Sequence, residues 1–233
     1  MSATLCEGLS VSSEVSRRTT RIKRLHARTK VNIIEAAERL IGLRGINGVT
    51  QREIVVAAGS AHNDAITYYF RNLSGLVNAI FEHRLPVAES RRGELLAATV
   101  FNHREPSIRD LIVVLYQPLT EQRDRRGCHS YAAFLAGLLR FPKLGVRYKR
   151  FNEHAAAARA IELLAKSLPH LSQGQFWSRF AAVDDMVLTG IARLQTDDDN
   201  VSFAELVDMA AAAMQAGCRR LSQSAVSVQS FSN

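Results

Sequence analysis

The sequence has few cysteines, and the three it contains, Cys6, Cys128 and Cys218, are far apart in the chain. No Cys-x-x-Cys pair occurs, so the pattern indicates neither a zinc site nor a disulfide framework. Isolated thiols in an odd number are typical of proteins kept in a reducing compartment. We therefore expect no disulfide and a cytoplasmic protein.

Long apolar runs are also missing from the sequence. No run approaches the roughly 18 residues that a membrane-spanning helix needs. The first ten residues, MSATLCEGLS, contain no basic segment followed by an apolar stretch, so they do not resemble a secretory signal. We expect neither a membrane partner nor secretion.

Catalytic and cofactor-binding motifs are absent as well. The histidines of the C-terminal two thirds are scattered, and none has the HExxH or another fixed metal-ligand spacing. Neither a GxSxG elbow nor a P-loop occurs, and the glycines at 42, 45 and 48 fall at a helix end and turn. We therefore expect no enzyme, with no catalytic residue, no metal and no cofactor.

The composition that remains is that of a folded soluble protein with an excess of bases. Hydrophobic residues make up 47% of the chain and charged residues 22%. Thirty Lys and Arg against 22 Asp and Glu give a net charge of +8 and a pI near 9.9. Such a balance favours a polyanionic partner, although a solvated basic surface alone is the alternative.

The most informative stretch is VTQREIVVAAGSAHNDAITYYF, residues 49–70. Thr50 and Glu53 have the spacing of a capping box, which predicts the start of a short helix. Gly59 is placed to end that helix with a positive φ angle. A second short helix follows and ends at Phe70. Two short helices across a tight glycine turn are typical of a helix-turn-helix that reads DNA.

A basic segment comes just before this motif. Residues 1–20 are rich in Ser and Thr, and we expect a disordered arm there. Between Glu14 and Glu35 there is no acidic residue, and the bases are Arg17, Arg18, Arg21, Lys23, Arg24, Arg28 and Lys30. A soluble tail is one interpretation. Phosphate or minor-groove contact, with Arg17 and Arg18 as candidates, explains its position better.

The rest of the chain is predicted to be helical almost throughout, because no long run of alternating β-branched residues suggests a sheet. A helix is expected over about 25–44, and another from about 73 with a kink or new start at Pro86. Further helices are expected at about 86–102, 107–122, 128–140, 147–167, 172–196 and 202–221. The predicted organisation is an arm at 1–20, a DNA-binding domain at 21–84, a larger helical domain at 85–221 and a disordered tail at 222–233.

Residues 33–81 resemble the DNA-binding domain of the TetR family of transcriptional regulators. The resemblance rests on the AAERLI helix, the Gly45 turn, the Arg52-Glu53-Ile54 and Ala57-Ala58-Gly59 segments and the closing Tyr-Tyr-Phe. It implies an all-α fold, with an N-terminal three-helix DNA-binding domain and a larger C-terminal domain for ligand binding and dimerisation. Many members end the motif with Leu-Tyr-x-His-Phe, whereas this chain has Ile-Thr-Tyr-Tyr-Phe and one extra residue before it. The register of the second helix is therefore open by one residue.

The candidate DNA-binding residues follow from this motif. Thr50 and Arg52 begin a helix and are expected to meet phosphates. Tyr68 and Tyr69 are expected to touch the DNA backbone or to pack. Candidates for base edges are Ser60, Ala61, His62, Asn63, Asp64 and Thr67. For His62 and Asp64 a local cap or turn bond is the alternative.

The resemblance also implies an effector cavity in the C-terminal domain, mostly apolar with a few polar groups. The candidates for its lining are His83, Leu115, Tyr116, Phe134, Leu138 and Trp177. Ordinary core is the alternative for the apolar members. Broad apolar faces on the last two helices predict a dimer interface with Phe176, Phe180, Val187, Met209 and Ala213. Packing within the chain alone is the alternative for these faces.

These features together predict a homodimeric repressor that binds a palindromic DNA operator and is released by a largely apolar small molecule. The alternative is an all-helical module that binds a protein partner and has no sequence-specific affinity for DNA. Binding to duplex DNA, and its dependence on salt, would discriminate between the two.

Overall fold

The protein was analysed as a computed structural model, which describes residues 4–62, 64–102, 105–139, 154–194 and 201–217. The described residues form helices and contain no strand, so the predicted all-α fold is confirmed. The helices are α1 (Thr4–Arg44), α2 (Gln51–Ala57), α3 (Ala65–Phe70), α4 (Leu73–Asn102), α5 (Ile108–Glu121), α6 (Ser130–Leu139), α8 (Ala155–Lys166), α9 (Gln173–Arg193) and α10 (Phe203–Gln215). A short 3₁₀ turn, Ile46–Gly48, links α1 to α2. No helix in these ranges is long and apolar enough to cross a membrane.

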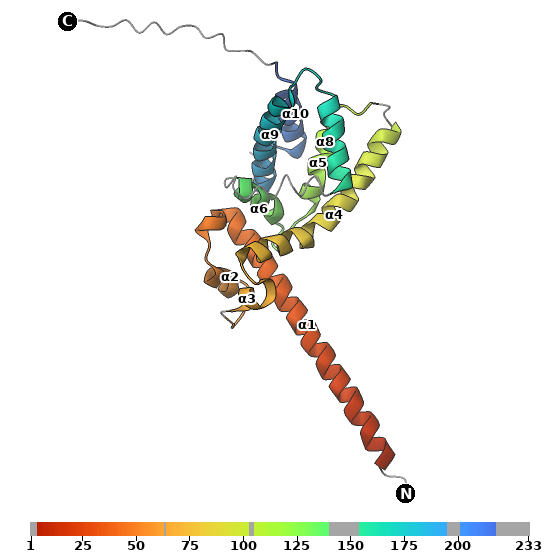
Figure 1. Cartoon of the computed structure of the whole chain (residues 1–233), viewed down its shortest axis with the longest axis vertical. Coiled ribbons are helices and arrows are strands. Elements are labelled where there is room, and N and C mark those ends of the chain that lie inside the picture. Colours follow the sequence, from red (N-terminus) through yellow and green to blue (C-terminus); the bar gives the residue numbers. More distant parts are fainter. Residues whose placement is uncertain (1–3, 63, 103–104, 140–153, 195–200, 218–233) are drawn as a thin grey trace, which may run out of the picture.

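Figure 1 shows two parts of unequal size. The head consists of the C-terminal half of α1, α2, α3 and the first turns of α4. The body consists of the rest of α4 with α5, α6, α8, α9 and α10. The N-terminal half of α1 projects from the head on the side away from the body. This arrangement places α2 and α3 in the head, away from α9 and α10 of the body.

Helix α1 is much longer than the sequence predicted. It begins at Thr4, so the expected disordered arm at 1–20 and the expected start near Leu25 are both wrong. The Ser and Thr content led to the prediction of a disordered arm. Residues 4–24, however, contain no Pro and one Gly, and their bases favour helix: Arg17, Arg18, Arg21, Lys23 and Arg24. At the other end of the chain α10 stops at Gln215 instead of about 221. The expected tail at 222–233 lies outside the described residues.

Helix α4 is continuous through Pro86, so the expected new start there is wrong. A proline removes one backbone hydrogen bond, but packing on both sides of it holds the helix. Leu85 is 9% exposed and Ala88 is fully buried. The boundary proposed between 84 and 85 therefore falls inside a continuous helix, which joins the head to the body.

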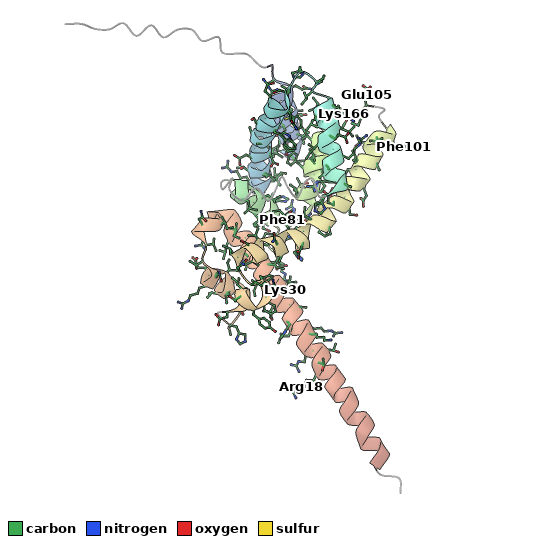
Figure 2. All side chains as sticks on the ribbon, viewed as in Figure 1. Arg18, Lys30, Phe81, Phe101, Glu105 and Lys166 are labelled. Atoms are coloured by element: carbon green, nitrogen blue, oxygen red, sulfur yellow. The ribbon has the colours of Figure 1, made fainter. Side chains whose placement is uncertain are left out.

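The head and body also meet where α1 crosses α6. Gly42 of α1 lies against α6, so that a Cβ atom built on it would be 2.9 Å from the backbone nitrogen of Phe134. A Cβ atom on Gly137 of α6 would be 2.8 Å from the carbonyl oxygen of Ile41. Only residues without a side chain allow two helices to approach this closely. Phe81 of α4 stacks edge-on against Phe134 beside this crossing, with 5.6 Å between ring centroids, and Figure 2 shows it where head and body join.

A buried ion pair lies at the same junction. Glu38 of α1 is fully buried and accepts hydrogen bonds from the Arg84 guanidinium of α4, at 2.7 Å to Oε2 and 2.9 Å to Oε1. The Ser130 hydroxyl of α6 donates a further hydrogen bond to Oε1. Burial alone would lower the pKa of Arg84, but the hydrogen bond and charge of Glu38 outweigh it and the pKa is raised. One carboxylate thus ties three helices together at the head–body junction.

Candidate nucleic-acid interface

The N-terminus of α2 is held by the capping box that the sequence predicted. The Glu53 backbone N–H donates to Thr50 Oγ1 at 3.2 Å, and the Thr50 N–H donates to Glu53 Oε2 at 2.8 Å. Arg44 at the end of α1 donates to the other Glu53 oxygen at 2.7 Å. Arg52 is exposed beside this cap. The free N–H groups of this helix start and the neighbouring Arg52 suit an anionic ligand such as phosphate.

These hydrogen bonds lower the pKa of Glu53 from its ordinary value of 4.5 to about 2. The largest cause is the hydrogen bond from the Thr50 backbone, followed by the Thr50 hydroxyl and Arg44. Because the folded pKa is depressed, the stabilising contribution of the carboxylate is complete above about pH 4.5. It is lost as the pH falls through about 2.

We expect Thr50→Ala to lower the free energy of unfolding by about 1 kcal/mol, the usual effect of removing a threonine N-cap. The same change should raise the pKa of Glu53, because the hydroxyl no longer donates to it. Chemical denaturation and a carbon-13 NMR titration of the Glu53 carboxyl measure the two effects. A Glu53 pKa that stays near 2 in the variant would show that the cap is not formed as described.

The turn between the two short helices depends on one glycine. Gly59 has a φ of 66° and directly follows the α2 C-cap, as the sequence predicted. Three residues of α3, Ala65, Ile66 and Phe70, are buried in the core, where α3 packs on α4 and α2. Thr67 and Tyr68 are exposed, and 72% of Tyr68 is accessible. α3 therefore presents a polar outer face while its inner face is fixed in the core.

The other residues predicted for base contacts lie in the turn before α3. Ala61, His62 and Asp64 are exposed, Ser60 is half-buried, and Asn63 lies outside the described residues. Asp64 occupies the N-cap position of α3, but its side chain makes no capping hydrogen bond. Its carboxylate is therefore not used by the cap, which was the alternative for this residue. For His62 the backbone N–H donates weakly to Ser60 Oγ, at 3.4 Å.

A groove of about 750 Å³ separates α1 from the turn and from α3. On one side it is lined by Leu25, His26, Thr29 and Asn32 of α1, and on the other by residues from Ala58 to Tyr69. The His26 ring lies edge-on to Tyr68 and Tyr69, with centroid distances of 6.4 and 6.2 Å. Tyr69 is half-buried, as expected for a packing residue. Sequence reasoning missed His26 and Thr29, although their position on α1 continues the periodicity of the buried residues further along it.

The basic residues before the motif lie on α1. All the described ones are exposed: Arg18, Arg21, Lys23, Arg24, Arg28 and Lys30. The side chain of Arg17, the other predicted contact, lies outside what the structure describes. Lys30 Nζ lies 5.8 Å from the centre of the Phe70 ring, which places this end of the basic segment next to α3.

The residues predicted to line the effector site do not all lie in the same part of the structure. Leu115, Tyr116, Phe134 and Leu138 are buried in the body, and the Tyr116 hydroxyl donates to Asp184 Oδ1 of α9 at 2.9 Å. His83 is exposed on α4, so it does not face the interior. Trp177 is half-buried and lines a groove of about 340 Å³ between α8 and the start of α9. Sequence reasoning did not select Asp184, whose signal is a charge on the apolar face of α9, between Phe180 and Leu188.

The residues predicted for the dimer interface also differ in burial. Phe176, Phe180 and Val187 of α9 are 5%, 1% and 0% exposed in a single chain. They pack inside the protomer, so the expectation that they face a second copy is corrected. The physical reason is that α9 lies between α6 and α10 and uses its apolar face for them. Met209 of α10 is 49% exposed and Ala213 is half-buried, so both reach the surface.

Residues 33–80 match the family model described as bacterial regulatory proteins, tetR family. The match begins in α1 where its side chains become buried and ends in the first turns of α4, and so covers the head. No curated protein matches the chain.

Proposed function

Through its head, the chain belongs to the TetR family of DNA-binding transcriptional regulators, and on that premise we propose how it works. We propose that it acts as a homodimeric repressor in the cytoplasm. Two heads bind the half-sites of a palindromic operator, and a small, largely apolar effector releases them.

The observation that supports DNA reading most strongly is the geometry of α2 and α3. The buried side of α3 is fixed by Ile66 and Phe70, while Thr67 and Tyr68 are exposed. Figure 1 shows α3 beside α2 in the head. A short helix held this way can enter a major groove with its outer side chains against base edges. The capped start of α2, with Arg52 beside it, then meets the adjacent phosphates.

We expect Arg52→Ala to weaken operator binding and to reduce the slope of log affinity against log salt by about 1 per protomer, because one phosphate contact is lost. Fluorescence anisotropy over a range of salt concentrations measures both quantities. Arg193→Ala, at the exposed end of α9 in the body, is the matched control and should leave both unchanged. Equal affinity and slope for Arg52→Ala and wild type would contradict the placement of α2 on phosphate.

Release by an effector requires that a structural change in the body reaches the head. The contacts at the head–body junction can transmit such a change. Gly42 and Gly137 bring α1 and α6 into backbone contact, and Glu38 links α1 to Arg84 and Ser130. A ligand that shifts α6 or α4 therefore shifts α1 and the spacing of the two heads. Such a ligand changes operator affinity only as far as it binds the two arrangements unequally.

The proposal for the effector site rests on the buried part of the predicted set. Leu115, Phe134 and Leu138 offer apolar contact, and Tyr116 with Asp184 supplies the polar group that orients a ligand. The proposal for the dimer interface rests on the outer side of α10. There Met209 is exposed among small alanines, which allow helices from two copies to approach closely.

Selection of binding sequences from a pool of random duplexes tests this function directly. The proposal predicts an enriched sequence with two-fold symmetry, bound by a dimer with strong dependence on salt. Recovery of a ligand from the purified protein by mass spectrometry, followed by release of the selected duplex, tests the effector. If no sequence is enriched, the protein-interaction module becomes the better description of the chain.

A further inference from the structure

Within the residues that the structure describes, no other helix packs on the N-terminal half of α1. Every described side chain from Arg18 to Arg24 is exposed, and Figure 1 shows the N-terminal half of α1 standing alone beyond α2 and α3. An isolated helix in water is marginally stable, because most helical stability in proteins comes from packing. An uncovered helix of this length therefore suits a surface that binds something else.

The charge of this segment indicates which class of partner it binds. Its described bases are Arg18, Arg21, Lys23, Arg24, Arg28 and Lys30, and no acidic residue occurs between Glu14 and Glu35. The structure shows no ion pair for these six bases within the residues it describes. Arg21, Arg24 and Arg28 are spaced by three and four residues, which places them on one side of the helix. Such a row is suited to a row of phosphates.

The position of the segment beside α3 indicates that the polyanion is duplex DNA. The groove of about 750 Å³ lies between α1 and α3, and the His26 ring of α1 contacts the rings of Tyr68 and Tyr69. Figures 1 and 2 show α1 projecting from the head away from the body, and the proposed function places a duplex against α3 of the same head. Figure 2 shows Arg18 on this projecting part and Lys30 at the head. The basic helix must then lie beside the same duplex.

We propose that the segment of α1 from Arg18 to Lys30 is a second DNA-contact element, which binds phosphates that flank the sequence read by α3. This inference rests on the proposed DNA-binding function and goes beyond it, because it assigns affinity to DNA outside the operator half-sites. The segment is about 18 Å long at a rise of 1.5 Å per residue. With one phosphate per 3.4 Å along each strand, it covers about five base pairs of flanking duplex.

The test compares two duplexes that carry the same selected operator. One ends at the operator, and the other extends by about one helical turn on each side, with flanks of arbitrary sequence. The full chain is compared with the triple variant Arg21→Gln, Arg24→Gln, Arg28→Gln. Glutamine preserves helix propensity, and circular dichroism verifies that α1 remains helical. Arg159→Gln, Lys166→Gln, Arg193→Gln is the control, since it removes the same charge from exposed sites on α8 and α9 of the body.

We expect the wild type and the control to bind the extended duplex more tightly than the short one, whatever the flanking sequence. The triple variant, which keeps Arg18, Lys23 and Lys30, should show a clearly smaller preference for the extended duplex. With three phosphate contacts gone from each protomer, its loss of affinity on the extended duplex between about 50 and 200 mM salt should be smaller by at least roughly 40-fold.

Equal binding of the two duplexes by the wild type overturns the inference and leaves the proposed function standing. Absence of binding to either duplex overturns the proposed function itself. An equal loss of affinity in the triple variant and the control also overturns the inference, because it would show a general effect of net charge. The inference is also overturned if the triple variant prefers the extended duplex as strongly as the wild type does. The partner of α1 would then be another polyanion or an acidic protein.

Discussion

Glu38→Ala should lower the free energy of unfolding by about 3–5 kcal/mol, the usual result of removing one partner from a buried ion pair. The side chain of Glu38 is fully buried, and that of Arg84 is only 14% exposed. Removal of the carboxylate leaves a guanidinium without its two hydrogen bonds in a region closed to water, and the Ser130 hydroxyl loses its acceptor. The urea midpoint measures the loss.

A double-mutant cycle distinguishes the effect of breaking the Glu38–Arg84 ion pair from the effect of losing side-chain volume. Arg84→Met combined with Glu38→Ala removes the stranded charge, so the double variant should be more stable than Glu38→Ala alone. Glu162→Ala is the control, because Glu162 pairs with Arg159 and Lys166 on the exposed side of α8 and its removal should not shift the midpoint. If Glu38→Ala behaves like Glu162→Ala, the junction is not held by this ion pair.

Gly137→Ala should destabilise the protein by about 1–3 kcal/mol, the typical cost of overpacking a tight contact. The new methyl group would lie 2.8 Å from the carbonyl oxygen of Ile41, and a backbone atom inside α1 cannot move aside as a flexible side chain can. The helices must therefore separate. Because the head is attached through α1, the same change should also weaken operator binding, and denaturation and DNA titration together measure both effects.

Gly93→Ala is the matched control for this change. Gly93 also lies inside a long helix, but a Cβ atom there meets nothing within 4 Å. Replacement of a mid-helix glycine by alanine in open space stabilises by about 0.5–1 kcal/mol. Opposite signs for Gly137→Ala and Gly93→Ala are therefore expected. A Gly137→Ala variant as stable as Gly93→Ala would show that α1 and α6 are not in backbone contact.

The parts of the structure that depend on neighbours in sequence were predictable. The Thr50–Glu53 cap, the positive φ of Gly59 and the burial of Phe70 all follow from residues within a few positions of one another. The same locality explains why the exposed face of α3 could be identified. The groove beside it could not, because it needs α1 and α3 side by side, about 40 residues apart in the chain.

The errors arose where packing overrides a local signal. Pro86 predicts a break, but burial of Leu85 and Ala88 keeps α4 continuous. Apolar spacing in α9 was interpreted as a dimer surface, yet that face is used within the protomer. The partners of the two buried carboxylates, Glu38 and Asp184, could not be predicted, since they lie on other helices.

The central claim is that α2 and α3 give this chain sequence-specific affinity for DNA. It is tested most directly by the ratio of two dissociation constants, one for the selected duplex and one for a shuffled duplex of equal length and composition, at about 0.15 M salt. We predict that the selected duplex binds at least about 10³-fold more tightly, as in specific protein–DNA complexes. Equal affinity for the two duplexes would contradict the claim.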